Sequence, residues 1–111
     1  MDKKIENTAR IFRALSVEKR VEIVKILAKR SLCVGALSNL IGISPGAVSQ
    51  HMRVLRDAGI VESDRRGYFV HYNLTPGIEK QLTSIVKTVF QQREGEKPCA
   101  ARRTNAKGRR S

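Results

Sequence analysis

Most of the side chains that could do chemistry lie on one short stretch. In this stretch, residues of types that are common at protein surfaces recur every three or four positions. This spacing places them along one face of a helix. They are Gly46, Ser49, Gln50, Arg53 and Asp57. Ser, Gln and Arg side chains can hydrogen-bond the edges of base pairs. The stretch therefore predicts a helix that presents hydrogen-bonding groups toward a partner such as nucleic acid.

The ends and the inner face of this helix are also marked. Ser44 can accept a hydrogen bond from the first-turn amides, Pro45 suits the first helical position, and Gly59 suits the end. The apolar residues group on the opposite face: Ala47, Val48, Met52, Val54, Leu55 and Ala58. We expect a helix to about residue 58, buried along one side. His51 flanks the buried side, where we expect a hydrogen-bonded structural histidine rather than a reader of bases.

A second group of candidate binding residues is the pair Arg65 and Arg66. They fall in an expected polar turn at residues 63–67, between two expected strands at residues 60–61 and 68–74. Basic side chains at the tip of a hairpin suit contact with phosphates or with a minor groove. The sequence thus predicts a basic hairpin after the polar helix.

The net charge favours a polyanionic partner. The 111 residues include 22 Lys and Arg against 10 Asp and Glu, which gives a formal charge of +12 and a pI near 10.6. On so small a chain this excess favours nucleic acid. Aromatic residues make up only 5%, with no Trp, so we do not expect an aromatic platform for stacked bases.

The same residues allow two other classes of function to be considered. Cys33 could act as a nucleophile with His51 or His71 as its base, but no third orienting group, glycine-rich phosphate loop or metal-ligand cluster is evident. We therefore expect no enzyme, and we expect His71 to be solvent-exposed. A small basic RNA-binding or non-specific nucleic-acid-binding protein fits the composition and is the alternative.

Apolar periodicity predicts four further helices around these features. The first carries a stripe of four residues: Ile5, Ala9, Phe12 and Leu15. The second, capped by Ser16, buries a stripe of its own: Val17, Val21, Val24 and Leu27. The third covers about residues 34–40 and stops at Gly42. The last starts at Thr75–Pro76 and carries a regular stripe: Ile78, Leu82, Ile85, Val86, Val89 and Phe90.

This order of elements predicts the fold class. Four helices, a hairpin and a fifth helix are the order of a winged helix-turn-helix, mainly α with a β-hairpin wing. The short helix before Gly42, the tight turn and the following polar-faced helix form its centre. A major groove about 12 Å wide admits one such helix.

Residues 32–74 resemble the ArsR/SmtB family of bacterial winged-helix repressors. They read LCVGALSNLIGISPGAVSQHMRVLRDAGIVESDRRGYFVHYNL, and the run ISPGAVSQHMRVLRDAGIV at residues 43–61 carries most of the likeness. The opening FRALSVEKRVEIVKIL is similar to the start of the family, and the likeness covers about residues 5–92. It implies a homodimer, paired through its first and last helices, that represses an operon by binding double-stranded operator DNA and releases it when an inducer binds.

The chain departs from the family pattern after the capping serine. Many members have Gln there, whereas this chain has Pro45 followed by Gly46. Base recognition is therefore expected to rest on Ser49, Gln50 and Arg53.

The resemblance also raises the question of what the protein senses. Zinc-responsive members bind metal through His, Asp and Glu on the last helix, but residues 77–92 contain no His, no Asp and only Glu79. Zinc needs about four ligands, so we do not expect zinc there. Arsenic-type members carry Cys-Val-Cys where this chain has Cys33, Val34 and Gly35. One thiolate does not hold a soft metalloid tightly, because tight binding takes two or three sulfurs.

The two cysteines leave three interpretations open. Cys33, at a helix start, and Cys99, beside basic residues, both lie where thiolate is favoured. They could bind arsenite together, or they could form a disulfide or polysulfide switch. In the third interpretation Cys33 is a small packing residue and Cys99 is incidental.

The chain is expected to hold one domain. We expect residues 1–92 to form the DNA-binding and dimerisation domain. Residues 93–111 hold seven basic and two acidic residues, a charge of +5, without apolar periodicity, so we expect a disordered basic tail. No apolar run approaches the ~20 residues that span a bilayer. We therefore expect a cytoplasmic protein with no membrane partner.

Overall fold

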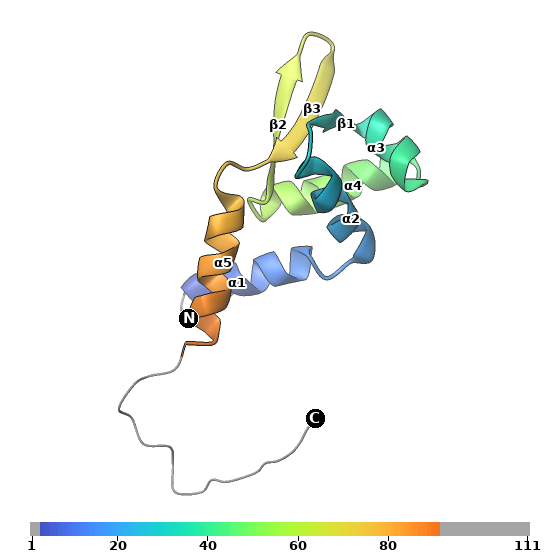
Figure 1. Ribbon diagram of the computed structural model, residues 1–111. Coiled ribbons are helices and arrows are strands. Elements are labelled where there is room, and N and C mark those ends of the chain that lie inside the picture. The colour runs from blue at the N-terminus through green and yellow to red at the C-terminus, as the bar shows by residue number, and fades with distance from the viewer. Residues whose placement is uncertain (1–2, 92–111) are drawn as a thin grey trace, which may run out of the picture.

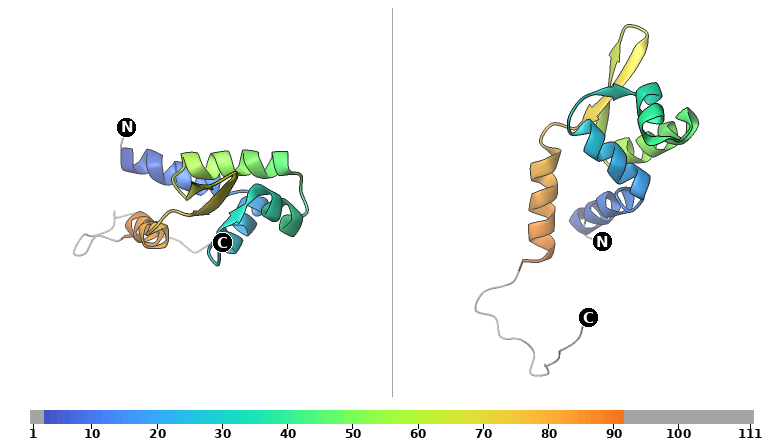
Figure 2. Two further views of the ribbon diagram at one scale, coloured as in Figure 1. Left: turned by 90° about the horizontal axis from the view of Figure 1, so that it is seen from above. Right: turned by 45° about the vertical axis from the view of Figure 1, so that its right-hand side comes forward.

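The computed structural model describes residues 3–91, which form five helices and three strands (Figure 1). In chain order the elements are α1 (Lys3–Ala14), α2 (Glu18–Leu27), β1 (Leu32–Cys33), α3 (Val34–Ile41), α4 (Pro45–Asp57), β2 (Val61–Arg66), β3 (Phe69–Leu74) and α5 (Ile78–Val89). The expected winged helix-turn-helix with five helices is confirmed. Figure 2 shows the β2–β3 hairpin projecting from the helical body.

The three strands form an antiparallel sheet in the order β1-β3-β2. The two-residue strand β1 pairs Leu32 with Tyr72 and Cys33 with His71. The sequence did not predict β1, because two residues are too few to show a period of two. This short strand ties the segment before α3 to the base of the hairpin.

The hairpin is longer than the sequence predicted, and its turn is elsewhere. β2 runs to Arg66 and pairs with β3 from Val61↔Leu74 to Arg66↔Phe69. The turn is at Gly67 and Tyr68, where Gly67 has a left-handed φ of 63°. The expected turn at residues 63–67 was wrong because β2 is exposed beyond its first residue. An exposed strand carries polar residues, and these resemble a turn in the sequence.

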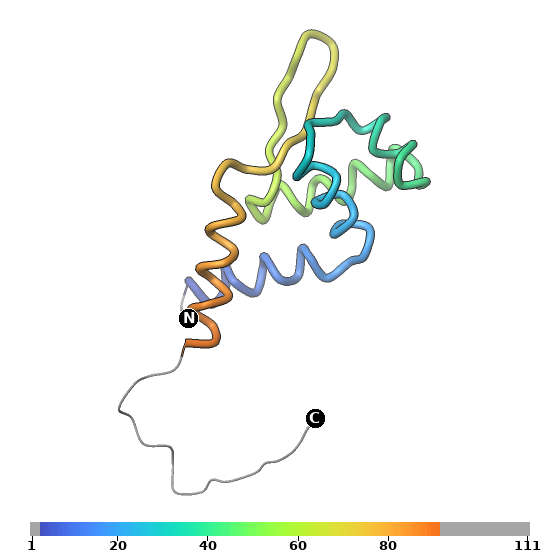
Figure 3. The backbone as a smooth tube through the Cα atoms, in the orientation of Figure 1, coloured from blue at the N-terminus to red at the C-terminus, as the bar shows by residue number. Residues whose placement is uncertain are grey.

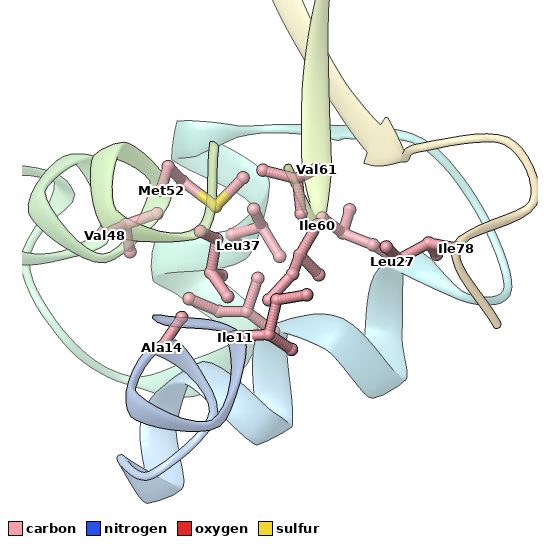
Figure 4. Close-up of a cluster of buried hydrophobic side chains, with 11 residues drawn as sticks. Ile11, Ala14, Leu27, Leu37, Val48, Met52, Ile60, Val61 and Ile78 are labelled. Carbon is pink, nitrogen blue, oxygen red and sulfur yellow. The ribbon is translucent and has the colours of Figure 1, made fainter. Parts of the chain in front are cut away.

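The hydrophobic core gathers one face of every helix and the start of β2 (Figure 4). Its buried members are Ile11, Ala14, Ile23, Leu27, Leu37, Val48, Met52, Leu55, Ile60, Val61 and Ile78. On α2 the predicted stripe is partly wrong, because Val21 is 42% exposed while Ile23 is fully buried. Ile23 and Leu27 are four residues apart, so the buried face of α2 is rotated relative to the predicted one.

Two of the predicted helix starts are wrong. Ser16 does not cap α2; its hydroxyl donates to the carbonyl of Arg13 at 2.7 Å, and Val17 takes the N-cap position without a side-chain hydrogen bond. α5 does not start at Thr75–Pro76, because a turn precedes it and Gly77 is its N-cap with φ 79°. In both places the polar residue before the helix interacts with the preceding element instead of capping the next helix. Ser16 bonds to the end of α1, and the amide of Thr75 donates to the carbonyl of Ile60 at 2.9 Å.

We predict that the inner and outer faces of α3 differ sharply in their contribution to stability. Leu37 is fully buried, whereas Leu40 is 54% exposed on the same helix. Leu37→Ala should lower the free energy of unfolding by about 2–5 kcal/mol, because it leaves a cavity in the core. Leu40→Ala, the control, should change it by less than about 0.5 kcal/mol. Urea unfolding of both variants at one protein concentration measures this, and equal losses would contradict the assignment of the buried face.

Candidate nucleic-acid interface

The turn between α3 and α4 is fixed by two local features, and Figure 3 follows the backbone through it. Gly42 ends α3 with a left-handed φ of 81°, and its amide donates to the carbonyl of Ser38 at 2.9 Å. The buried hydroxyl of Ser38 donates to the carbonyl of Ile43 across the turn. Ser38 was not expected from the sequence, where its only signal is a polar residue on the apolar side of a short helix. Together these bonds set where α4 begins.

Ser44 begins α4 as predicted. Its backbone is extended, with φ −69° and ψ 153°, and its hydroxyl accepts a hydrogen bond from the Ala47 amide at 3.1 Å. Pro45 occupies the first turn, where its missing N–H costs nothing. The exposed Gly46 has space for a side chain, since an added Cβ would meet only the Ser44 hydroxyl at 3.9 Å. Packing therefore does not require glycine at position 46. The missing side chain lets a binding partner approach the start of α4 closely.

The outer face of α4 is exposed and unpartnered. Gly46, Ser49, Gln50, Arg53 and Asp57 are all exposed. Within residues 3–91 the side chains of Ser49, Gln50 and Arg53 form no hydrogen bond and no ion pair. The inner face is held by the fully buried Val48, Met52 and Leu55. The structure thus brings the predicted polar residues together on one free surface.

The two arginines of the hairpin differ in their surroundings. Arg65 and Arg66 are adjacent in β2, so they lie on opposite faces of the strand. Arg66 donates through Nε to Asp64 at 3.0 Å, an exposed ion pair. Arg65 has no such partner among the described residues. Beyond them Tyr68 is 98% exposed at the turn. Arg65 is therefore the guanidinium that the hairpin leaves free.

His51 links the polar helix to α2. The Nε of Arg20 donates to Nδ1 of His51 at 3.2 Å, and both residues are partly buried. The expectation of a hydrogen-bonded histidine is confirmed. Burial, and secondarily the positive charge of Arg20, lower the pKa of His51 below its usual 6.5. The neutral imidazole is the form that can accept this bond. The role of Arg20 was not expected from the sequence.

Cys33 is half-buried at the end of β1 and is also the N-cap residue of α3, without a side-chain hydrogen bond. Its strand partner His71 is half-buried rather than solvent-exposed, with a buried Nδ1 that has no hydrogen-bond partner. The expected exposure of His71 was wrong because β3 is the central strand of the sheet and α2 and α3 pack against it. Cys99 lies outside the described residues. No three His, Cys, Asp or Glu residues within 3–91 converge in a group that could hold a metal ion.

An apolar groove of about 520 Å³ lies between α1 and α5 and is lined in part by Ile5, Phe12 and Val89. These three residues are 63%, 44% and 50% exposed, and Phe90 is 77% exposed. Two amphipathic helices thus leave part of their apolar stripes exposed within the monomer. No helix in the described part combines the length and apolarity that crossing a bilayer requires.

The fold and the free outer face of α4 define a winged helix-turn-helix DNA-binding protein. Solved structures agree. A homodimeric winged helix-turn-helix DNA-binding domain from Mycobacterium bovis superposes with a TM-score of 0.67 at 26% identity, covering 77% of this chain and 79% of that one. HlyU from Vibrio cholerae gives a TM-score of 0.66 at 28% identity, covering 83% of this chain and all of that one (100%).

Sequence relatives identify the family. Residues 18–63 match the family described as bacterial regulatory protein, arsR family. A cadmium resistance transcriptional regulatory protein CadC homolog of Staphylococcus aureus is 36% identical over 89 residues, which are 79% of this chain and 72% of the relative. The biofilm growth-associated repressor of Xylella fastidiosa is 34% identical over 94 residues, 85% of this chain and 82% of the relative. The chain belongs to the arsR family of bacterial transcriptional regulators.

We predict that the protein loses stability as the pH falls below about 6.5, the ordinary pKa of histidine. Because the pKa of His51 is lowered in the folded protein, the unfolded chain binds more protons below that pH, so acid favours unfolding. Above that pH the imidazole of His51 is neutral in both the folded and the unfolded chain, so it no longer makes stability depend on pH. Chemical unfolding at pH 7.5 and pH 5.5, which are about one unit either side of the ordinary value, measures the difference. His51→Gln should have a smaller difference than the parent, and an unchanged one would contradict the assignment.

Proposed function

We propose that this protein is a repressor that binds double-stranded operator DNA as a homodimer and leaves it when an inducer binds. The observation that carries the proposal is the outer face of α4, where Ser49, Gln50 and Arg53 are exposed and free of partners within the described residues. Relatives named as repressors support it, among them the biofilm growth-associated repressor and the arsenical resistance operon repressor of Escherichia coli.

The geometry of α4 suits the major groove. An α-helix with its side chains is about 10–12 Å across, close to the width of that groove. In it Arg53 can bind guanine through two hydrogen bonds and Gln50 can bind adenine in the same way. Ser44, Gly46 and Ser49, nearer the start of the helix, approach the DNA backbone and base edges. Arg65 and Arg66, on the wing, contact phosphates or the adjacent minor groove.

The homodimer would form through α1 and α5. Their exposed apolar residues, together with the groove between these helices, form a surface that a second copy can cover. The domain from Mycobacterium bovis with the same fold is homodimeric. Two copies of α4 would then face two half-sites of one duplex, in the manner of dimeric helix-turn-helix proteins. A DNA-binding repressor of this kind would act in the cytoplasm.

We predict that base recognition fails when the outer face of α4 is truncated. The full chain first selects a duplex from a randomised library, and fluorescence anisotropy then measures binding to it. Gln50→Ala and Arg53→Ala should each cost roughly 1–3 kcal/mol and relax specificity at one position. Arg65→Ala should weaken binding to all sequences alike and flatten the salt dependence.

Arg30→Ala is the matched control, since Arg30 is exposed beyond the far end of α2. A Gln50→Ala, Arg53→Ala double variant that binds the selected duplex as tightly as the parent would contradict the proposal. So would a preference for structured RNA over the duplex, which is the result expected of an RNA-binding protein.

The inducer is proposed to act at Cys33. This thiol is half-buried directly before α3, and α3 is joined to α4 by the turn that Ser38 and Gly42 fix. A modification there would move α3 and with it the start of α4. A shift of ~1 Å is enough to misalign hydrogen bonds to base edges. Arsenite would require further sulfur ligands, for which Cys99 is the proposed second thiol.

We predict that Cys33→Ser abolishes release of DNA by thiol-reactive compounds. A coupling of ~1–3 kcal/mol would lower the operator affinity of the parent by ~5–150-fold. Arsenite, polysulfide and an oxidant are added in turn to the parent, Cys33→Ser and Cys99→Ser, each bound to the selected duplex. Undiminished release from Cys33→Ser would contradict the proposal. A parent that ignores all three compounds would leave Cys33 as a packing residue.

A further inference from the structure

A basic hollow lies between α1, α2 and α4, apart from the residues already assigned to DNA contact. It has a volume of about 370 Å³, and its polar lining consists of Arg10, Arg13, Ser16, Arg20 and Asp57. Three guanidinium groups and one carboxylate give this lining a formal charge of +2. The sequence showed no such cluster, because its members come from three helices.

The guanidinium groups in the hollow are largely unpaired. Within residues 3–91 the side chains of Arg10 and Arg13 form no hydrogen bond and no ion pair, although Asp57 lines the same hollow. Arg20 uses Nε to bind His51, which leaves the two terminal nitrogens of its guanidinium without a partner in the described chain. Three like charges repel one another, and an oxyanion among them would relieve that repulsion and accept several charge-assisted hydrogen bonds.

The backbone around the hollow also suits an anion. α2 begins beside it, and its N-cap residue Val17 supplies no side-chain hydrogen bond to the first-turn amides. A helix start favours negative charge, and Glu18 in the first turn supplies part of that charge. The hydroxyl of Ser16 donates to the Arg13 carbonyl at 2.7 Å, which fixes the end of α1 and the position from which Arg13 extends.

The hollow borders the outer face of α4. Asp57 lies four residues after Arg53 and seven after Gln50, so all three share one face of the helix, and Asp57 also lines the hollow. Arg20 is attached to His51, the residue after Gln50. Figure 2 shows α1 and α4 along the same side of the molecule. An anion bound in the hollow would therefore lie at the edge of the surface that faces DNA.

We propose that this hollow binds one phosphate group of the DNA backbone at the edge of the groove that α4 enters, and so sets the register of α4 on the duplex. The inference rests on the proposed function. Arg13 and Arg10 supply the free guanidinium donors, and Arg20 ties the bound phosphate to α4 through His51. The same oxyanion chemistry is found in free inorganic phosphate, so the experiment must separate the two sources.

The test uses the full chain and the duplex that it selects, with binding measured at several KCl concentrations. Arg13→Ala is the main variant, because Arg13 is exposed and its loss leaves no buried partner. It should lower affinity roughly 10- to 150-fold, as expected for a lost charge-assisted hydrogen bond. It should also reduce the slope of log K against log salt by about 0.9, the value for one phosphate contact. The matched control Arg30→Ala should change neither quantity.

Neutral methylphosphonates, placed one at a time along the duplex, locate the contact. A methylphosphonate at one backbone position should lower the affinity of the parent for the duplex. The same methylphosphonate should not lower the affinity of Arg13→Ala any further. An unchanged salt slope in Arg13→Ala, or no such position, would overturn the inference. If inorganic phosphate binds the parent at the arginines and no backbone position responds, the hollow is a free-ion site and the DNA assignment is wrong.

Failure of the proposed function has a different signature. If the proposed function is wrong, the full chain will select no duplex, or the Gln50→Ala, Arg53→Ala double variant will bind the selected duplex as tightly as the parent. Loss of binding by that double variant together with an unaffected Arg13→Ala would overturn only the inference about the hollow.

Discussion

The burial of one side of α4 is the constraint on which the rest of the structure depends. Val48, Met52 and Leu55 are fully buried among residues of the other helices and β2. Because interiors are close-packed, a helix with three such anchors cannot rotate about its axis without opening a cavity. The rotation of α4 is therefore fixed, and its outer face is fixed with it. Ser49, Gln50 and Arg53 are exposed together as a consequence of packing on the opposite side.

The position of α4 along its axis depends on different interactions. The Ser38 hydroxyl and the left-handed Gly42 hold the turn before it, and the bond from Arg20 to His51 holds its middle against α2. These are few and directional bonds, in contrast to the core. A change near α3 or α2 can therefore displace α4 while the core stays packed. This division suits a DNA-binding helix whose placement is to be regulated, since a small shift breaks aligned contacts without unfolding the domain.

The surface divides into regions of different chemistry. The side that carries α4 is polar and basic, with the arginine-lined hollow at its edge. The α1 and α5 helices instead expose Ile5, Phe12, Val89 and Phe90. A domain this small has too little interior to cover such stripes by itself. In the proposed homodimer, self-association through α1 and α5 would leave the other surface free to bind nucleic acid.

The sequence by itself determined the number and order of the helices, the fold class and the composition of the outer face of α4. These depend on local physics: apolar residues at helical spacing, a capping serine before proline, and glycines where the chain turns left-handed. The family resemblance followed from the same stretch. Ser44, Gly42 and Gly59 have the local roles that their types predict.

Only the tertiary structure decided which distant residues meet. The two-residue strand β1, the half-burial of His71 beside it, the bond from Arg20 to His51 and the hollow in which Arg10, Arg13 and Arg20 meet Asp57 all join segments far apart in the chain. None of them leaves a periodic pattern, because each depends on the packing of whole elements and not on neighbouring residues. The length of the hairpin was misjudged for a related reason. An exposed strand has no buried face, so its residues need not alternate between apolar and polar. Its run of polar residues therefore resembles a turn in the sequence, and only the pairing with β3 shows that it is a strand.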